Sequence, residues 1–345
     1  MELNFWKEPF QQKPQVFDHI ISLGQSCQVA YQLGRLGLRF EAYPFDWLFS
    51  FDTNKLIEAL ESRFTDWLKF DNLVECSPQS NSLHKIVIDS KYGMTHQHIF
   101  PLSVSLSESY SVVKEVVNRR VKRLLDLYGS GQNILFIRTN LTFEEGVRLS
   151  KVLSRIFGEN VILLGVSLQK DVFRLHEMGY TGNYYYCKIY DCGYNSPGDR
   201  WQGHDQHWSM LLRNIQTRYV EVDLAKDNYF QNVYPPEFEK ASSKKAFRWL
   251  KNNSKLELEE FVGSFCKLYL SCPVKIPIQV LDIFGNPIFE ASQFGEFQCS
   301  FAITHQTHQL SFHIPDMWRP CDLMGTEDSR ALGVCLKRIC IERQL

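Results

Sequence analysis

The feature of this sequence that most constrains its fold is a change in the spacing of its apolar residues. Up to about residue 217, runs of consecutive apolar residues alternate with segments in which apolar residues recur every three or four positions. Beyond about residue 255, apolar and polar residues alternate. The first pattern is typical of buried strands separated by amphipathic helices, and the second of half-buried strands. The sequence therefore predicts two parts with different architectures.

Residues 19–37 predict a strand, a sharp turn and a helix. Residues 19–23 form a short, mostly apolar run, and Gly24 permits the turn. Ser26 is a favourable N-cap residue, and Gly37 lies where a helix-terminating glycine belongs. Units of this kind open many α/β domains, whose sites gather at the carboxyl ends of the strands.

The rest of the N-terminal part continues this alternation. Thr142 and Glu145 have the spacing of a capping box at the start of a helix. The expected strands are 133–138, 161–166 and 184–189, and the expected helices include 107–128 and 171–178. We therefore expect residues 1–217 to form a Rossmann-like α/β domain, a mainly parallel sheet flanked by helices. The basic face of the helix 107–128 is either a solvated surface or an anion-binding surface, and it comprises Lys114, Arg119, Arg120, Lys122 and Arg123.

The C-terminal part has the pattern of a small β domain. Residues 218–254, with Pro235-Pro236 and Ser242-Ser243, are expected to be a linker. Gly285-Asn286 predicts a hairpin turn. The expected strands are 277–284, 288–291, 297–303, 309–314 and 334–342. We expect residues 255–345 to be an accessory β-sandwich.

Composition excludes several classes of protein. The 345 residues carry 38 Lys and Arg against 39 Asp and Glu, a net charge of −1, which argues against nucleic acid or anionic membranes as partners. No run approaches the ~18 apolar residues of a membrane span. The N-terminal residues lack the basic and apolar regions of a signal peptide, so the ten cysteines are expected to be reduced thiols. We expect a cytoplasmic protein.

Cys27 is the residue best placed for chemistry. It falls in the first turn of the predicted helix, where unpaired N–H groups and the helix dipole favour a thiolate. The same N–H groups could stabilise an oxyanion. The alternative is that Cys27 is a small buried apolar residue.

A thiolate nucleophile requires a base, and histidines are the first candidates. His96 and His98 precede the helix 107–128, in a segment that resembles a loop or a strand end, and could also be a metal pair or one core and one exposed histidine. Cys187, Cys192, His204 and His207 approach zinc-finger spacing, but His-x2-His is short of the usual gap. We predict neither a metal nor a cofactor. The other candidate histidines in this part are His19, His84 and His176.

Four segments in order resemble a bacterial family. They are Ser22-Leu23-Gly24-Gln25-Ser26-Cys27, Tyr43-Pro44-Phe45-Asp46-Trp47, His98-Ile99-Phe100, and the Trp-x-Gly-x-Asp-x-x-Trp motif of residues 201–208. The family is the DUF1796 group, described as putative papain-like cysteine peptidases, and the resemblance covers residues 15–215. Ile99 stands where the family has an acidic residue.

The resemblance implies a set of site residues. Cys27 would be the nucleophile and His98 its base, and Asp46 or Asp205 would orient the histidine. Trp201 and Trp208 are seven residues apart, on one face if helical, and are either core aromatics or a wall on which substrate stacks. The expected substrate-binding residues are Ser26, Trp47, Trp201, His204 and Trp208.

The interpretation that follows is a cysteine hydrolase or acyltransferase acting on a peptide, acyl or glycan substrate. A second hypothesis makes Ser26 the nucleophile of a sugar O-acyl esterase of the SGNH type. A third is a non-catalytic glycan-binding protein of polysaccharide biosynthesis. Residues 314–334 resemble the ending of bacterial polysaccharide-associated enzymes, although Asp328 and Arg330 could also simply clamp a turn. The sequence does not specify an oligomeric state.

Overall fold

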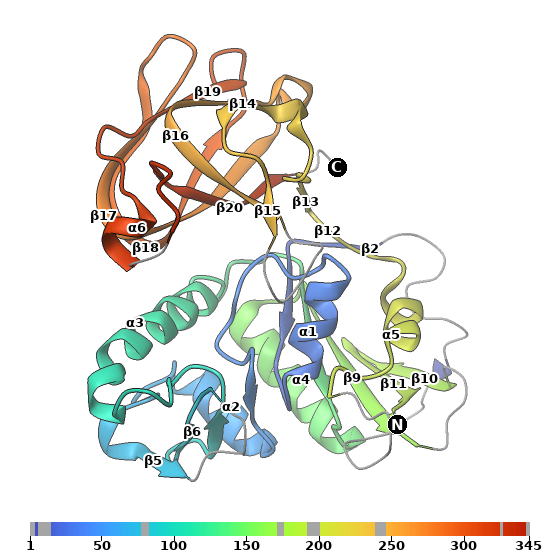
Figure 1. Cartoon of the computed structure of the whole chain (residues 1–345). Coiled ribbons are helices and arrows are strands. Elements are labelled where there is room, and N and C mark those ends of the chain that lie inside the picture. Colours follow the sequence, from blue (N-terminus) through green and yellow to red (C-terminus); the bar gives the residue numbers. More distant parts are fainter. Residues whose placement is uncertain are drawn as a thin grey trace. The chain divides into compact units, whose positions relative to one another are not determined.

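The computed structural model describes residues 4–5, 15–76, 83–170, 176–191, 201–238, 246–324 and 327–342. The chain divides into two compact units, Met1–Thr217 and Arg218–Leu345 (Figure 1). Each unit has its own hydrophobic interior. The site residues named above all belong to the N-terminal unit.

A six-stranded sheet forms the centre of the N-terminal unit, in the order β1-β10-β11-β9-β8-β3. The four strands from β11 to β3 are parallel, whereas β10 and β1 are antiparallel to their neighbours. The parallel strands run almost wholly through apolar surroundings; β8 is buried at every residue. The strands are β1 (Asn4–Phe5), β3 (His19–Ser22), β8 (Ile134–Thr139), β9 (Val161–Gln169), β10 (His176–Thr181) and β11 (Tyr184–Tyr190).

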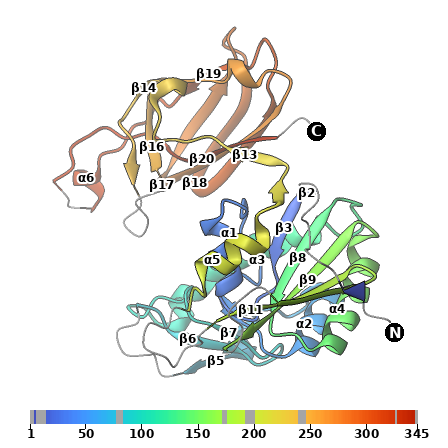
Figure 2. The same ribbon diagram turned by 90° about the vertical axis from the view of Figure 1, so that its right-hand side faces the viewer.

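Helices cover both faces of this sheet (Figure 2). On one face, α1 (Gln28–Arg35) and α5 (Asp205–Leu212) pack against alternate residues of the strands. On the other face lie α2 (Thr53–Glu61), α3 (Leu106–Leu125) and α4 (Phe143–Phe157). Because successive strand residues point to opposite faces, both faces of the parallel strands are buried.

The helix boundaries follow from local capping. The capping box predicted at Thr142 and Glu145 is confirmed at the start of α4, and Ser105 with Glu108 forms another at the start of α3. The basic side chains of α3 have partners within the chain: Lys114 donates to the carbonyl oxygen of Trp67, and the other pairs are Arg119–Glu115, Lys122–Asp126 and Arg123–Glu41. These contacts favour a structural and solvated face over an anion-binding one.

Two smaller sheets complete this unit. An antiparallel sheet has the order β4-β7-β6-β5, and β2 pairs in parallel with β12. The short helix η1 (Phe70–Asn72) directly precedes β5. The strand bounds are β2 (Gln15–Phe17), β4 (Leu48–Phe49), β5 (Leu73–Cys76), β6 (Ile86–Asp89), β7 (Met94–His96) and β12 (Ile215–Thr217). Because Leu48 pairs with His96, the segment after Trp47 lies beside the segment before His98.

The expectation of a Rossmann-like, mainly parallel α/β fold is wrong. Strands make up 40% of the structure against 25% helix, and the sheets are mixed. Residues 176–178 of the expected helix belong to β10, and residues 171–175 lie outside the described residues. Thr181 pairs with Tyr184, so Gly182 and Asn183 form a two-residue hairpin turn that makes β10 antiparallel. Several other strands span only two to four residues, too few to show a periodicity.

The C-terminal unit is built from antiparallel strands. The long strands β16 and β17 each pair with β20 near one end and with β19 near the other, so these four strands close on themselves. Aliphatic residues from all four fill the interior. The strands are β13 (Tyr219–Glu221), β14 (Phe230–Val233), β15 (Glu237–Phe238), β16 (Ala246–Glu257), β17 (Phe265–Leu281), β18 (Pro287–Ala302), β19 (Gln309–His313) and β20 (Cys335–Glu342), with the short helices η2 (Asp227–Tyr229), η3 (Glu259–Phe261) and α6 (Pro320–Met324).

The segment 218–254, expected to be a linker, contains β13, β14, β15 and the start of β16 in its described part. Three of these strands are two to four residues long, which explains why no alternation was visible. The separate strands expected at 288–291 and 297–303 are one strand, β18.

Within the described residues, none of the helices has the length and apolar character needed to cross a bilayer. The nine described cysteines are all free thiols.

The glycines of α1 and α4 give a matched test of packing. A Cβ at Gly146 in α4 would lie 2.0 Å from Cζ of the fully buried Tyr184, whereas a Cβ at Gly34 in α1 would meet nothing within 4 Å. We expect Gly146→Ala to lower the free energy of unfolding by about 2 kcal/mol through overpacking. Gly34→Ala should raise it by up to ~1 kcal/mol through helix propensity. Urea unfolding followed by circular dichroism measures both, and equal stability of the two variants would contradict this account of the core.

Candidate functional site

Cys27 is the N-cap residue of α1, three residues after the turn at Gly24 that follows β3. It therefore lies at the carboxyl end of the parallel strands, where sites of such sheets are found. Only 3% of its surface is exposed, and its carbonyl oxygen accepts the first helical hydrogen bond from the N–H of Tyr31 at 3.0 Å. The place after the Gly24 turn is the one expected from sequence, but Cys27 is the N-cap residue where Ser26 was predicted, and the thiol is covered.

The surroundings of Cys27 keep its thiol protonated. Burial, with a smaller contribution from the charge of Asp46, raises its pKa from 9.0 to about 11, and a hydrogen bond from the Cys27 backbone offsets only part of this rise. A rise of this size corresponds to about 3 kcal/mol against ionisation. A helix N-terminus supplies only ~0.3–1 kcal/mol in favour of a negative charge. The resting site thus contains a thiol, where the position in the helix alone predicted a thiolate.

Asp46 is held by other partners. Its side chain is 1% exposed and forms an ion pair with Arg39 at 2.8 Å. The same carboxylate accepts a hydrogen bond from the backbone N–H of Tyr43 at 3.0 Å. Asp46 therefore fixes its own turn and acts on Cys27 through its charge.

His98 is an exposed residue in the segment just after β7. Its ring contacts Trp47, with 6.1 Å between centroids, and His84, at 6.3 Å. Partial desolvation and the charge of His84 hold its pKa below the usual range, so it is neutral at pH 7 and able to accept a proton. Among the described residues, no hydrogen bond or ring contact joins His98 to Cys27.

A line of ring contacts connects the helix of Cys27 with His98. The ring of Tyr31, one turn beyond Cys27 in α1, lies 5.2 Å from Trp201, which lies 6.0 Å from Trp47. We call Tyr31, Trp201, Trp47 and His98 the aromatic row. Trp201 is 37% exposed and His98 is exposed, so a ligand can reach the row.

Two residues in or beside this row, Tyr31 and Arg39, were not singled out from sequence, and His84 was named only as one of several candidate histidines. Tyr31 could have been found, because residues four apart in a helix share a face. Arg39, whose guanidinium lies 5.8 Å from the Trp47 ring, has no sequence signal. Nor does the sequence indicate that His84 lies beside His98, since only the fold brings them together.

The two tryptophans of the last motif are separated by the structure. Trp208 is fully buried in the core between α5 and the sheet, whereas Trp201 precedes α5, which begins at Asp205. The two residues therefore do not share a helix face, because Trp201 is not in the helix. Trp208 is a core aromatic, and Trp201 belongs to the aromatic row.

His204 and Asp205 fasten α5 to its neighbours. The Nδ1 atom of His204 accepts the N–H of His207 at 3.4 Å and so caps α5. Asp205 forms an ion pair with Arg35 at 3.2 Å and accepts a hydrogen bond from Gln32 at 2.8 Å, both on α1. Neither residue contacts Cys27 or His98 in the described structure.

Ser26 is also nearly buried, with 9% of its surface exposed. Its hydroxyl oxygen accepts the backbone N–H of Gln28 at 3.5 Å, a weak contact in the first turn of α1. No histidine contacts it among the described residues, so the geometry offers Ser26 no base.

The residues with near zinc-finger spacing do not form a zinc site in the part of the chain that the structure describes. Cys187 is fully buried within the sheet, where burial raises its pKa strongly, and Cys192 lies outside the described residues. The rings of His204 and His207 lie 4.3 Å apart and tilted to each other, and each meets the Tyr190 ring edge-on. No group of three or more potential metal ligands occurs among the residues described.

In the C-terminal unit, Asp328 and Arg330 clamp the segment before β20. Arg330 donates to the Asp328 carboxylate at 2.7 and 2.9 Å and to Glu237 at 2.7 Å. The indole N–H of Trp318 donates to the carbonyl oxygen of Gly333 at 3.0 Å. These contacts give Asp328, Arg330 and Trp318 a structural role in this unit.

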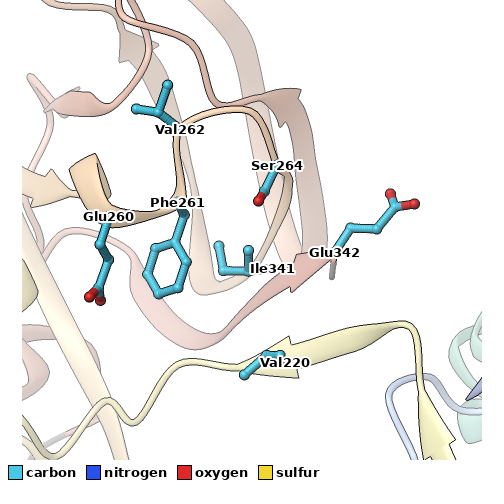
Figure 3. A pocket seen from close by; sticks show the side chains of 7 residues that line it. All are labelled: Val220, Glu260, Phe261, Val262, Ser264, Ile341 and Glu342. Atoms are coloured by element: carbon cyan, nitrogen blue, oxygen red, sulfur yellow. The ribbon is translucent and has the colours of Figure 1, made fainter. Parts of the chain in front are cut away.

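The same unit has an open cavity of about 390 Å³ (Figure 3). Its apolar part includes Phe261 and Ile341, and its two carboxylates already have partners. Glu260 accepts the Tyr229 hydroxyl at 2.5 Å, and Glu342 pairs with Arg218 at 3.1 Å. The lining residues are Val220, Glu260, Phe261, Val262, Ser264, Ile341 and Glu342.

Comparisons with solved structures find only remote likenesses. A family 6 carbohydrate-binding module is 10% identical with a TM-score of 0.23, covering 37% of this chain and 95% of that one. An acetyl xylan esterase from the rumen bacterium Butyrivibrio proteoclasticus is 12% identical with a TM-score of 0.24, covering 37% of this chain and 33% of that one. TM-scores this low do not establish a shared fold or ligand.

Sequence comparisons are more informative. An uncharacterized protein of Acanthamoeba polyphaga mimivirus is 31% identical over 134 residues, covering 34% of this chain and 60% of the viral protein. The chain thus spans 60% of the length of this curated relative. Residues 18–162 match the model of a family described as "Putative papain-like cysteine peptidase (DUF1796)". This stretch contains the first three motifs, and the motif of residues 201–208 lies beyond it. Over residues 18–162, this chain therefore matches the DUF1796 family that its motifs predicted.

Proposed function

We propose that the N-terminal unit is a cysteine-dependent hydrolase or acyltransferase in which Cys27 is the nucleophile and His98 the base. One observation carries the proposal: Cys27 caps α1 at the carboxyl end of the parallel strands, and the aromatic row begins one turn along the same helix. The description of the matched family, a cysteine peptidase, supports this class of chemistry.

The reaction must create the thiolate during attack. With a pKa of about 11, the thiolate fraction of Cys27 at pH 7 is roughly 1 in 10,000. Neutral His98 would take the thiol proton as the sulfur bonds to the substrate carbonyl carbon, and would then return that proton to the leaving group. The free N–H groups of the first turn of α1 would bind the resulting oxyanion.

The resting positions of the two groups set a condition on this reaction. Since no described contact joins His98 to Cys27, the segment that carries His98 must approach Cys27 when substrate binds. The aromatic row would hold an acyl substrate that has an apolar portion, such as a peptide or an acylated sugar. Substrate binding and assembly of the dyad are therefore coupled in this proposal.

In the free protein, the thiol of Cys27 should react slowly, at a rate that depends on pH. We expect alkylation of Cys27 by iodoacetamide to be slow at pH 7 and to rise with pH up to about 11, because a raised pKa keeps the thiol protonated below that value. Peptide-resolved mass spectrometry measures the rate, and the half-buried Cys321 of the C-terminal unit is the internal reference. Fast labelling of Cys27 that does not change between pH 6 and 8 would contradict the resting geometry.

Substitutions separate the three hypotheses. On a panel of activated esters and peptide amides, Cys27→Ala should abolish turnover and His98→Ala should lower kcat by about 100-fold or more. Ser26→Ala and Cys76→Ala, a half-buried cysteine elsewhere in the unit, are the matched controls and should retain activity.

Two results would overturn the assignment. Loss of activity in Ser26→Ala but not in Cys27→Ala would identify a serine esterase. Binding of an acylated or free glycan that survives both Cys27→Ala and His98→Ala, with no turnover of any substrate, would identify a non-catalytic protein.

A further inference from the structure

Arg138, at the carboxyl end of β8, is a buried cation. Only 1% of its surface is exposed, and burial lowers its pKa to about 10 although Glu145 and Asp52 oppose that change. Among the described residues, no carboxylate forms an ion pair with it. Burying a charge without a counter-ion is costly, so the contacts that the guanidinium does make require an explanation.

The Arg138 guanidinium donates hydrogen bonds to two other segments of the chain, at Leu23 and at Ser50. Its Nη1 atom donates to the carbonyl oxygen of Leu23 at 2.5 Å and to Oγ of Ser50 at 2.9 Å, and its Nη2 atom donates to the carbonyl oxygen of Ser50. Leu23 is the last residue before the Gly24 turn. The planar fork of arginine is suited to holding several acceptors in fixed directions at once.

Ser50 extends this contact across the turn. Its backbone N–H donates to the carbonyl oxygen of Gln25 at 2.9 Å. A Cβ at Gly24, where φ is +79°, would lie 2.6 Å from Oγ of Ser50 and 3.5 Å from Nη1 of Arg138. Arg138 and Ser50 thus bond to the residues before and after Gly24 and leave no room for a larger residue there.

Asn140, two residues beyond Arg138, holds the turn from another direction. Its Nδ2 atom donates to Oε1 of Gln25 at 2.8 Å, and its Oδ1 atom accepts the N–H of Leu168 at 3.2 Å. The turn that leads to Cys27 is therefore bonded to Arg138 in β8, to Asn140 just after β8 and to Ser50 just after β4. Asn140 is in turn bonded to Leu168 of β9.

We infer that Arg138 is the positioning residue of the proposed active site: through Leu23 and Ser50 it fixes the turn that places the Cys27 sulfur at the start of α1. That this position matters for catalysis rests on the proposed function. The structural content of the inference, control of the position and accessibility of Cys27, can be measured without a substrate.

Arg138→Lys keeps the charge but removes the fork. We expect the turn to loosen, Cys27 to become more exposed, and its alkylation at pH 9 to become about tenfold faster or more, as its pKa moves from about 11 toward 9.0. The measurement is the pH profile of alkylation at Cys27, with the rate at Cys321 as reference. Thermal unfolding is recorded in parallel to show that the variant is folded.

Arg248→Lys is the matched control, because Arg248 is an equally buried guanidinium in the C-terminal unit. It donates to the carbonyl oxygen of Leu224 at 2.6 Å and pairs with Asp227 at 2.7 Å. Arg248→Lys should lower stability without changing the alkylation profile of Cys27. A merely structural role for Arg138 would give the same result as this control.

Ser50→Ala decides the question if Arg138→Lys does not fold. It removes one acceptor of the guanidinium and should speed alkylation of Cys27 in the same direction, by a smaller factor. Folded Arg138→Lys or Ser50→Ala protein with the wild-type alkylation profile overturns the inference. Loss of turnover plays no part in this test, so failure of the proposed function would be seen separately in the Cys27→Ala assay.

Discussion

The hydrogen bonds that the buried Arg138 guanidinium makes to Leu23 and Ser50 are the interactions on which the candidate site depends. Parallel strands end with carbonyl groups that have no further strand to bond, and a turn that leaves such an edge must satisfy them in another way. Here the guanidinium of Arg138, on the neighbouring strand β8, donates to the carbonyl oxygen of Leu23. The location of Cys27 is thus fixed from inside the sheet, by groups that never reach the surface.

Two opposing effects act on the pKa of Cys27, the helix N-terminus and desolvation, and desolvation is the larger. The N-terminus of α1 favours a thiolate, but desolvation of a sulfur that is 3% exposed outweighs it, and the buried Asp46 acts in the same sense as desolvation. Arg39 offsets part of the Asp46 charge through their ion pair. The proposed function therefore requires a base that acts during the reaction, and it requires His98 to reach Cys27.

Besides the Cys27 sulfur, the candidate site includes the surface formed by the rings of the aromatic row. Its four rings come from α1, from the turn before β4, from the segment after β7 and from the segment before α5. Pairing of β4 with β7 brings two of these segments together. The small antiparallel sheet, which also places Leu48, Val87 and Met94 in the core, therefore helps to form the candidate site.

The sequence by itself determined the local structure and the identity of the candidate residues. The apolar runs at 133–138 and 161–166, the capping box at Thr142, the glycine turn before Cys27 and the family motifs all depend on neighbouring residues, and such signals are readable in the chain. Tertiary structure alone decided the antiparallel strands at the sheet edge, the closure of β16, β17, β19 and β20, the separation of Trp201 from Trp208, and the burial that raises the pKa of Cys27. Strands of two to four residues carry no periodicity, and desolvation depends on what packs over a side chain from elsewhere in the chain. The position of Cys27 was therefore predictable, whereas its protonation state and its dependence on Arg138 were not.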